Sequence, residues 1–176
     1  MSQFLSFFYN ISIGEICHSN DTRTVNQIIE YSEEDLESDH SFIQWILPSP
    51  RKSQYNLTIP SISYDEIKSI RDDKRVIFYI DLFVNKILTY WGLNPWNINK
   101  IYLLSGHNGL RFSRLIESVI LFQRVEFIPI IFHLINRICN SNLLHISYGI
   151  YKNQHLPLWK IRYLESLKIV NNDISE

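Results

Sequence analysis

The amino-acid sequence predicts an all-α domain, and three observations support this fold class. Apolar residues recur at helical spacing in several segments, and most of these segments begin near a residue pattern that caps helices. The chain contains only 5 glycines and 6 prolines, fewer than a β-sandwich with many tight turns requires. Its 176 residues suit one domain. We therefore expect a single compact domain of roughly six to eight helices over residues 1–170, and a polar tail over residues 171–176.

The N-terminal part of the chain predicts an irregular arm followed by two short helices. Residues 1–22 become polar after an aromatic cluster, so we expect an arm that packs its aromatic side chains on the core. Thr24 suits the N-cap of a helix that continues through Tyr31. Residues 32–35 resemble a capping box and place acids where the helix dipole favours them, so a second helix leads toward Asp39. The aromatic cluster consists of Phe4, Phe7, Phe8 and Tyr9.

The segment from Asp39 to Pro48 predicts a short helix that is buried on all sides. His40 and Gln44 are four residues apart, so they share one face of a helical turn. Pro48 ends the helix. Because an unpaired buried polar group costs about 1–3 kcal/mol, both side chains need partners. The rest of the circumference is apolar and consists of Phe42, Ile43, Trp45, Ile46 and Leu47.

The middle of the chain contains the clearest helical pattern. Residues 48–62 read as a loop, and Ser63 begins a second capping-box pattern for a helix to about Arg71. Asp72 or Asp73 then opens a long helix that ends before a glycine C-cap. Its apolar stripe consists of Val76, Ile80, Phe83, Val84, Ile87 and Trp91, and the closing glycine is Gly92.

The last third of the chain predicts four more helices. Two have strong apolar stripes and span residues 110 to about 122 and 125–138. Pro129 lies in the first turn of the second, where its missing N–H is tolerated. Shorter helices are expected over residues 143–151 and 157–170.

Composition and charge narrow the classes of function. The net charge of −1 argues against a chain devoted to nonspecific nucleic-acid binding, although a local basic patch would permit it. Cys17 and Cys139 have no zinc-ligand spacing and suit a reducing compartment. We find no signal peptide, and charges interrupt the longest apolar region, so we expect no membrane span. The expected location is cytoplasmic, or nuclear in a eukaryotic host, with no metal and no cofactor; the oligomeric state stays open.

A second polar pattern lies near the start of the helix at residues 110–122. His107, Arg111, Arg114 and Ser118 follow helical spacing along one face, and Asn108 sits beside them. Helix N-termini bind anions through free N–H groups, and two arginines strengthen that preference. One interpretation is therefore an anion or phosphate site. The other is a solvated helix face with Asn108 as its N-cap.

Neither polar pattern contains a known catalytic motif. The sequence has no H-E-x-x-H, P-loop, G-x-G-x-x-G or G-x-S-x-G pattern. His40 and Gln44 fit a pair of core hydrogen-bonding residues as well as a binding site. Spacing alone leaves both interpretations open.

Three motifs give the chain a specific resemblance to a known family. Residues 39–48 resemble the signature of the opioid growth factor receptor conserved region. That signature has a His, an aromatic residue and then Ile-Gln-Trp-Leu-Phe-Pro. This chain has Ile46-Leu47 where the family has Leu-Phe. Residues 107–118 are similar to the family's His-Asn-x-Leu-Arg-Ile-Thr-Arg-Ile-Leu-x-Ser. Residues 60–67 also resemble the family's proline and acid-rich helix start. Order and spacing agree over residues 1 to about 160.

The resemblance implies a short, stand-alone member of bacterial or viral type. Animal members include a nuclear-associated receptor for an enkephalin-type peptide, but they carry long additional segments, and that activity does not transfer to a short microbial chain. The polar residues singled out above fall inside the family motifs, so we expect the two helices that carry them to touch.

The resulting hypothesis is a non-enzymatic binding module for a small anionic ligand, such as a nucleotide or phosphate, or for a peptide or protein partner. One alternative is an enzyme acting on a phosphate-containing substrate, with His40 or His107 as acid/base and arginines holding charge. Another is a purely structural domain, because a satisfied polar network also stabilises one fold. The candidate ligand-binding residues are His40, Gln44, Trp45, His107, Asn108, Arg111 and Arg114.

Overall fold

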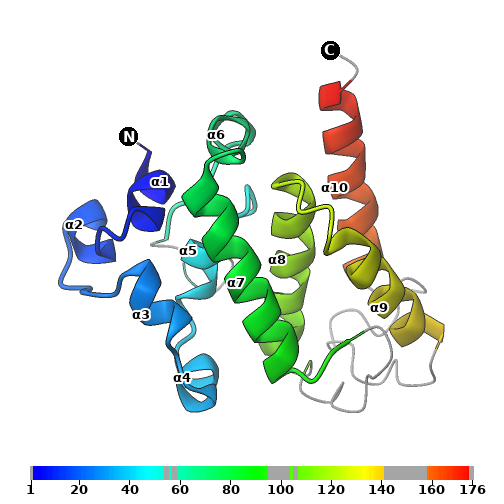
Figure 1. Cartoon of the computed structure of the whole chain (residues 1–176), viewed down its shortest axis with the longest axis horizontal. Helices are drawn as coiled ribbons and strands as arrows, with labels where there is room; N and C mark the ends of the chain where they lie inside the picture. Colours follow the sequence, from blue (N-terminus) through cyan, green and yellow to red (C-terminus); the bar gives the residue numbers. More distant parts are fainter. Residues whose placement is uncertain are drawn as a thin grey trace. The chain divides into compact units, whose positions relative to one another are not determined.

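The computed structural model shows an all-α fold, as the sequence predicts (Figure 1). The structure describes residues 2–53, 56, 59–94, 104, 107–140 and 158–174. These residues form ten helices, more than the predicted number, because the first 22 residues contribute two. The helices are α1 (Gln3–Phe8), α2 (Ile13–Cys17), α3 (Val25–Ile29), α4 (Glu33–Ser38), α5 (Ile43–Ile46), α6 (Tyr64–Ile70), α7 (Lys74–Tyr90), α8 (His107–Leu121), α9 (Ile128–Asn140) and α10 (Leu158–Ile174).

The chain divides into two compact units, Met1–Val84 and Asn85–Glu176. The boundary falls inside α7, so this continuous helix contributes residues to both units. A single domain over residues 1–170 stays a prediction. No helix in the described part of the chain is long and apolar enough to cross a membrane.

The N-terminal arm is helical, so the prediction of an irregular segment was wrong. Ser2 caps α1, and Ser12 forms a capping box with Glu15 at the start of α2. Each helix has only one or two turns, which is too short for a recognisable apolar period. The aromatic residues do pack on the core as predicted, except that Tyr9 is exposed and lies under the guanidinium of Arg75.

Helices α3, α4 and α6 start where the capping patterns predict them. Thr24 and Gln27 form a capping box at α3, and Ser32 and Asp35 form one at α4. Ser63 caps α6 through the backbone N–H of Glu66. These hydrogen bonds satisfy backbone donors that no intrahelical carbonyl reaches.

Aromatic side chains form the core of the first unit around α5. The ring of Trp45 lies 5.4 Å from that of Phe4 and 5.5 Å from that of Phe7, measured between centroids. Phe42 makes edge contacts with Tyr31 and with Phe83 of α7. Edge-to-face packing of this kind adds about 0.5–1.5 kcal/mol beyond area burial. Helix α5, which the sequence predicts to be buried, therefore lies in the core of this unit.

Helix α7 confirms the strongest sequence prediction. All six residues of its predicted stripe have no exposed surface. Gly92 has φ 60 and ends the helix: its N–H bonds to the Thr89 carbonyl, and the Leu93 N–H bonds to the Leu88 carbonyl, each at 2.9 Å. This pair of hydrogen bonds is a Schellman motif, which favours glycine because of the left-handed backbone.

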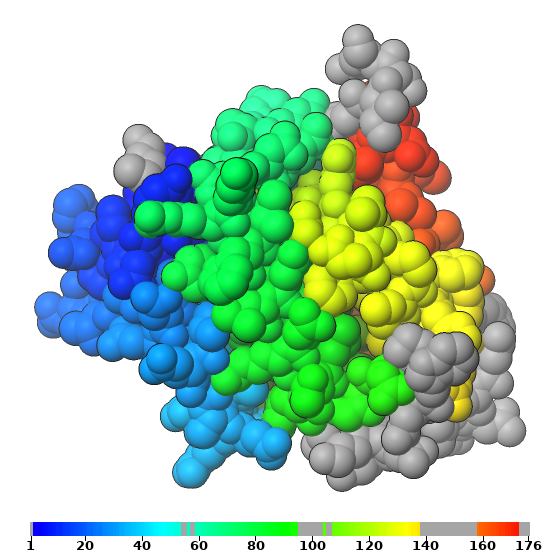
Figure 2. All heavy atoms as spheres, in the orientation of Figure 1, coloured from blue at the N-terminus to red at the C-terminus, as the bar shows by residue number. Residues whose placement is uncertain are grey.

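In the second unit, α10 packs along α8, and both helices contact α9 (Figure 1). The Trp159 indole N–H of α10 donates to the Gly109 carbonyl of α8 at 3.0 Å, and its ring packs edge-on against Phe112. Atoms of α9 reach the surface (Figure 2). Phe132 on this helix is 49% exposed.

Three boundaries in the second unit differ from prediction. Helix α8 begins at His107, three residues earlier than expected, and α9 begins at Ile128, still with Pro129 in its first turn. Helix α10 continues to Ile174, so residues 171–174 belong to the helix and not to a tail. The helix predicted over residues 143–151 lies outside the described residues.

Helix α2 packs closely on the loop that follows it at Gly14, and a substitution there tests this packing. The Gly14 N–H bonds to the Asp21 carbonyl at 2.5 Å, and a Cβ at this position would lie 2.5 Å from the carbonyl oxygens of both Ser19 and Asp21. Backbone atoms cannot move aside as a side chain does. We expect Gly14→Ala to lower the free energy of unfolding by about 2 kcal/mol or more, measured by urea denaturation. Ser6→Ala in α1 is the control, and a Gly14→Ala loss within about 0.5 kcal/mol would contradict the packing.

Candidate functional site

The predicted site residues fall into two groups that belong to different units. His40, Gln44 and Trp45 lie in the first unit, and the remaining candidates lie on α8 in the second. The predicted contact between the two groups stays a prediction. Each group is therefore a separate candidate site, with its own burial and partners.

His40 does not lie where the sequence predicts. Helix α5 begins at Ile43, and His40 precedes it in an exposed bend with its ring Nδ1 2.7 Å from the Ser38 carbonyl. The prediction that His40 shares a buried helical face with Gln44 was wrong. The reason is local: a side-chain oxygen of Asp39 accepts the backbone N–H of Ser41 at 2.8 Å, and such a turn competes with helix before residue 43.

Gln44 and Trp45 are buried, as predicted, but differ in role. Gln44 is 8% exposed; its Nε2 donates to Ser53 Oγ at 3.5 Å, and its buried Oε1 has no hydrogen-bond partner among the described residues. Trp45 is 1% exposed and enclosed by aromatic rings, so it stabilises the core of this unit. Gln44 ties α5 to the loop after it.

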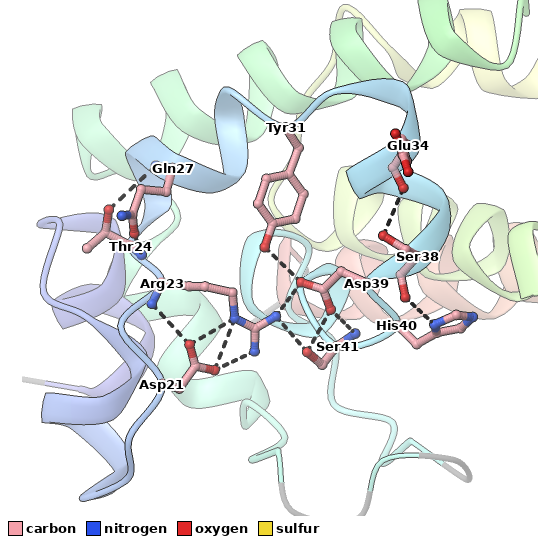
Figure 3. Close-up of polar contacts among 10 residues, drawn as sticks. All are labelled: Asp21, Arg23, Thr24, Gln27, Tyr31, Glu34, Ser38, Asp39, His40 and Ser41. Carbon is pink, nitrogen blue, oxygen red and sulfur yellow. Dashed lines mark hydrogen bonds and ion pairs between the residues drawn. The ribbon is translucent and has the colours of Figure 1, made fainter.

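A charged network that the sequence does not reveal joins two connecting segments of the first unit (Figure 3). The Arg23 guanidinium forms ion pairs with Asp21 and Asp39 and donates to Ser41 Oγ at 2.7 Å. The Tyr31 hydroxyl donates to the same Asp39 carboxylate at 2.8 Å. Arg23 and Asp39 are 16 residues apart, so no short motif links them. The Asp-x-Ser turn at residues 39–41 was the one local signal available.

Hydrogen bonds keep Asp39 ionised. Burial alone would raise the pKa of its carboxyl, but the Ser41 N–H, the Tyr31 hydroxyl and the Arg23 guanidinium outweigh that effect and lower the pKa to about 2. Burial and the hydrogen bond to Asp39 raise the pKa of Tyr31 to about 12. Hydrogen bonds from Arg23 lower the pKa of Asp21. The partners satisfy one another, so the network stabilises the entry to α5.

Helix α8 carries buried polar side chains along the predicted face. Asn108 and Arg111 are 3% and 4% exposed, and Arg111 Nη1 donates to Asn108 Oδ1 at 3.0 Å. Because the helix begins at His107, Asn108 lies in its first turn and does not serve as the predicted N-cap. Ser118 has no exposed surface. The interpretation of this face as solvated is therefore wrong.

The charge on α8 is held away from water. Burial lowers the pKa of Arg114 to about 10, and attraction to Glu117 only partly offsets this effect. Glu117 is itself 3% exposed. Ser118 Oγ, one turn beyond Arg114, is buried and has no hydrogen-bond partner among the described residues. The helix carries two arginines and one glutamate, so its formal charge is +1 in a poorly solvated setting.

This arrangement suits recognition of a negative group more than metal binding. Guanidinium groups donate several hydrogen bonds in a planar fork, which matches carboxylate and phosphate oxygens. The described part of the chain contains no group of three His, Cys, Asp or Glu residues that could hold a metal ion.

Comparison with known proteins gives no match to a family model, to a curated protein or to a solved structure. The resemblance to the opioid growth factor receptor conserved region therefore stays a prediction. It rests on the motif residues of this chain, and the physical account of α8 stands independently of it.

The low pKa of Asp39 makes stability depend on pH. Its pKa is about 2 in the folded protein and about 3.9 when unfolded, so the stabilisation is complete above about pH 5 and is lost as the pH falls toward 2. The ionised Asp39 carboxylate therefore contributes about 2 kcal/mol to the free energy of unfolding at neutral pH. The unaltered protein should lose part of its free energy of unfolding between pH 6 and pH 3, where the Asp39 carboxyl of the unfolded chain becomes protonated. We expect Asp39→Asn to reduce this loss, as measured by urea titrations at each pH.

Asp72→Asn changes an exposed carboxylate outside the network and is the control for this measurement. It should keep the pH dependence of the unaltered protein. An Asp39→Asn variant with the same pH dependence would contradict the assignment of the low pKa.

Proposed function

We propose that this chain is a non-enzymatic binding module that recognises a small anionic ligand through α8. The observation that carries the proposal is the buried polar face formed by Asn108, Arg111 and Arg114. A phosphate group, or the carboxylate of a peptide or protein partner, has the charge and the acceptors that these side chains recognise.

Desolvation of Arg114 supports recognition of an anion. A lowered arginine pKa means that the folded protein disfavours the charged form relative to water. Glu117 is the one carboxylate on α8, and its attraction to Arg114 offsets only part of the effect of burial. An anion beside Arg114 would raise that pKa toward its ordinary value and stabilise the folded state.

The position of these residues on the helix also supports the proposal. His107 and Arg114 are seven residues apart, or about 10 Å along the helix axis, so they mark the two ends of a strip across the first two turns. The positive end of the helix dipole lies at the same end of α8. The hydroxyl of Ser118 extends the strip with another polar group.

The resemblance to the opioid growth factor receptor conserved region adds support, because the family motif covers this same strip. A structural network is the second candidate function, and the hydrogen bond between Arg111 and Asn108 favours it. His40, one of the two histidines considered as acid/base, lies in an exposed bend with its ring Nδ1 2.7 Å from the Ser38 carbonyl.

Ligand-induced thermal stabilisation tests the proposal. Inorganic phosphate and AMP should raise Tm, and the shift should reach about 5–10 °C when the ligand is at about one hundred times Kd. We expect Arg114→Gln to abolish the shift and to keep the helical circular-dichroism signal, because it removes the charge and keeps much of the side-chain volume. AMP acting at lower concentration than phosphate would point to a nucleotide as the ligand.

The control is Arg162→Gln, which removes an arginine from α10 in the same unit. It should keep the ligand-induced shift. If Arg114→Gln loses its helical signal altogether, α8 is a structural network. If it keeps the full shift, the anion binds elsewhere and the proposal fails.

A further inference from the structure

A cavity in the first unit lies outside the site proposed on α8. Its volume is about 510 Å³, within the range of small-molecule sites. All of its described lining residues belong to the first unit. The lining residues are Gln3, Cys17, Lys52, Ser53, Asn56, Ile59, Pro60 and Ser61.

Partly buried hydrogen bonds support one wall of this cavity. Ser53 Oγ accepts the backbone N–H of Asn56 at 2.9 Å and lies 3.5 Å from the Gln44 Nε2. Gln44 belongs to α5, so it connects the wall to the buried aromatic core of the unit. A cavity wall supported in this way is preorganised, which lowers the entropy lost when a ligand binds.

The described lining of the cavity carries a single positive charge. Lys52 is the one charged residue among the described lining residues, and it forms no ion pair with the described part of the chain. Ser61 and Gln3 add a hydroxyl and an amide, and Ile59 and Pro60 add apolar surface. Cys17 does not add a nucleophile: burial and the nearby Asp21 raise the pKa of its thiol, which therefore stays protonated at neutral pH.

We propose that this cavity binds a small hydroxylated monocarboxylate, with the carboxylate on Lys52 and the hydroxyls on the neutral polar side chains. One ammonium group matches one negative charge, and the described lining holds no second cation for a dianionic phosphate. The serine hydroxyl and the amide match sugar-like hydroxyl groups, since both donate and accept hydrogen bonds. Gln44 is a positioning residue that acts through Ser53.

Three sugars that differ only at one carbon test this charge preference. Glucuronate carries a carboxylate at C6, glucose a neutral alcohol and glucose 6-phosphate a dianion. The readout is the rate at which iodoacetamide alkylates Cys17, measured by mass spectrometry at about pH 8.5, where more of the thiol is ionised. A Cys139→Ser variant removes the other cysteine of the chain, so the signal reports Cys17 alone.

Glucuronate should slow the alkylation in a saturable way, about tenfold when its concentration is about ten times Kd. Glucose should have no effect, and glucose 6-phosphate should protect more weakly than glucuronate. Absence of protection by glucuronate up to about 50 mM, or equal protection by glucose, would overturn the proposal.

Lys52→Gln removes the charge and should abolish protection by glucuronate. Lys74→Gln is the matched control, because Lys74 is also exposed in this unit and does not line the cavity. Full protection in Lys52→Gln would overturn the assigned role of Lys52. Arg114→Gln should leave the protection unchanged, so failure of this proposal is distinguishable from failure of the site on α8.

Discussion

The second unit depends on the burial of charge along α8. Two arginines and a glutamate lie within two turns of one another, and burial lowers the pKa of Arg114 despite the nearby Glu117. Burial of a charged side chain carries a desolvation penalty that its partners must offset, so these residues constrain the fold strongly. The Trp159 contact with Gly109 and the packing of α10 along α8 keep this strip in a fixed position. The proposed binding role is one explanation for that penalty, and a specific hydrogen-bonded network is the other.

The first unit depends on a different constraint, the conformation of the segment that leads into α5. Asp39 ends α4 and accepts hydrogen bonds from three residues, which directs the chain into the aromatic core at Phe42 and Trp45. His40 is excluded from that core because the turn at Asp39 points it to solvent. Helix α5 then positions Gln44 against the wall of the cavity. One local turn thus determines which motif residues pack and which reach the surface.

The sequence predicts the parts of this fold that depend on neighbouring residues. Capping boxes at Thr24 and Ser32 and the apolar stripe of α7 need no information about distant residues. Helices α1 and α2 are too short to show a period, so their caps were the only available signal. Arg23 was missed because its partner Asp39 is 16 residues away, and the burial of Arg111 depends on tertiary packing that helical spacing alone does not reveal. The cavity was missed for the same reason, since its walls come from separate segments.

The most direct test of the account is whether α8 binds an anion through its guanidinium groups. Arginine Nε–Hε signals in ¹⁵N–¹H spectra report the charge and the hydrogen bonding of individual side chains, and Arg111→Lys and Arg114→Lys variants assign the two signals of interest. The account predicts that titration with inorganic phosphate shifts these two signals in a saturable way and leaves the Arg23 signal unchanged. Saturable shifts in other arginines alone, or no shift at Arg111 and Arg114, would contradict it.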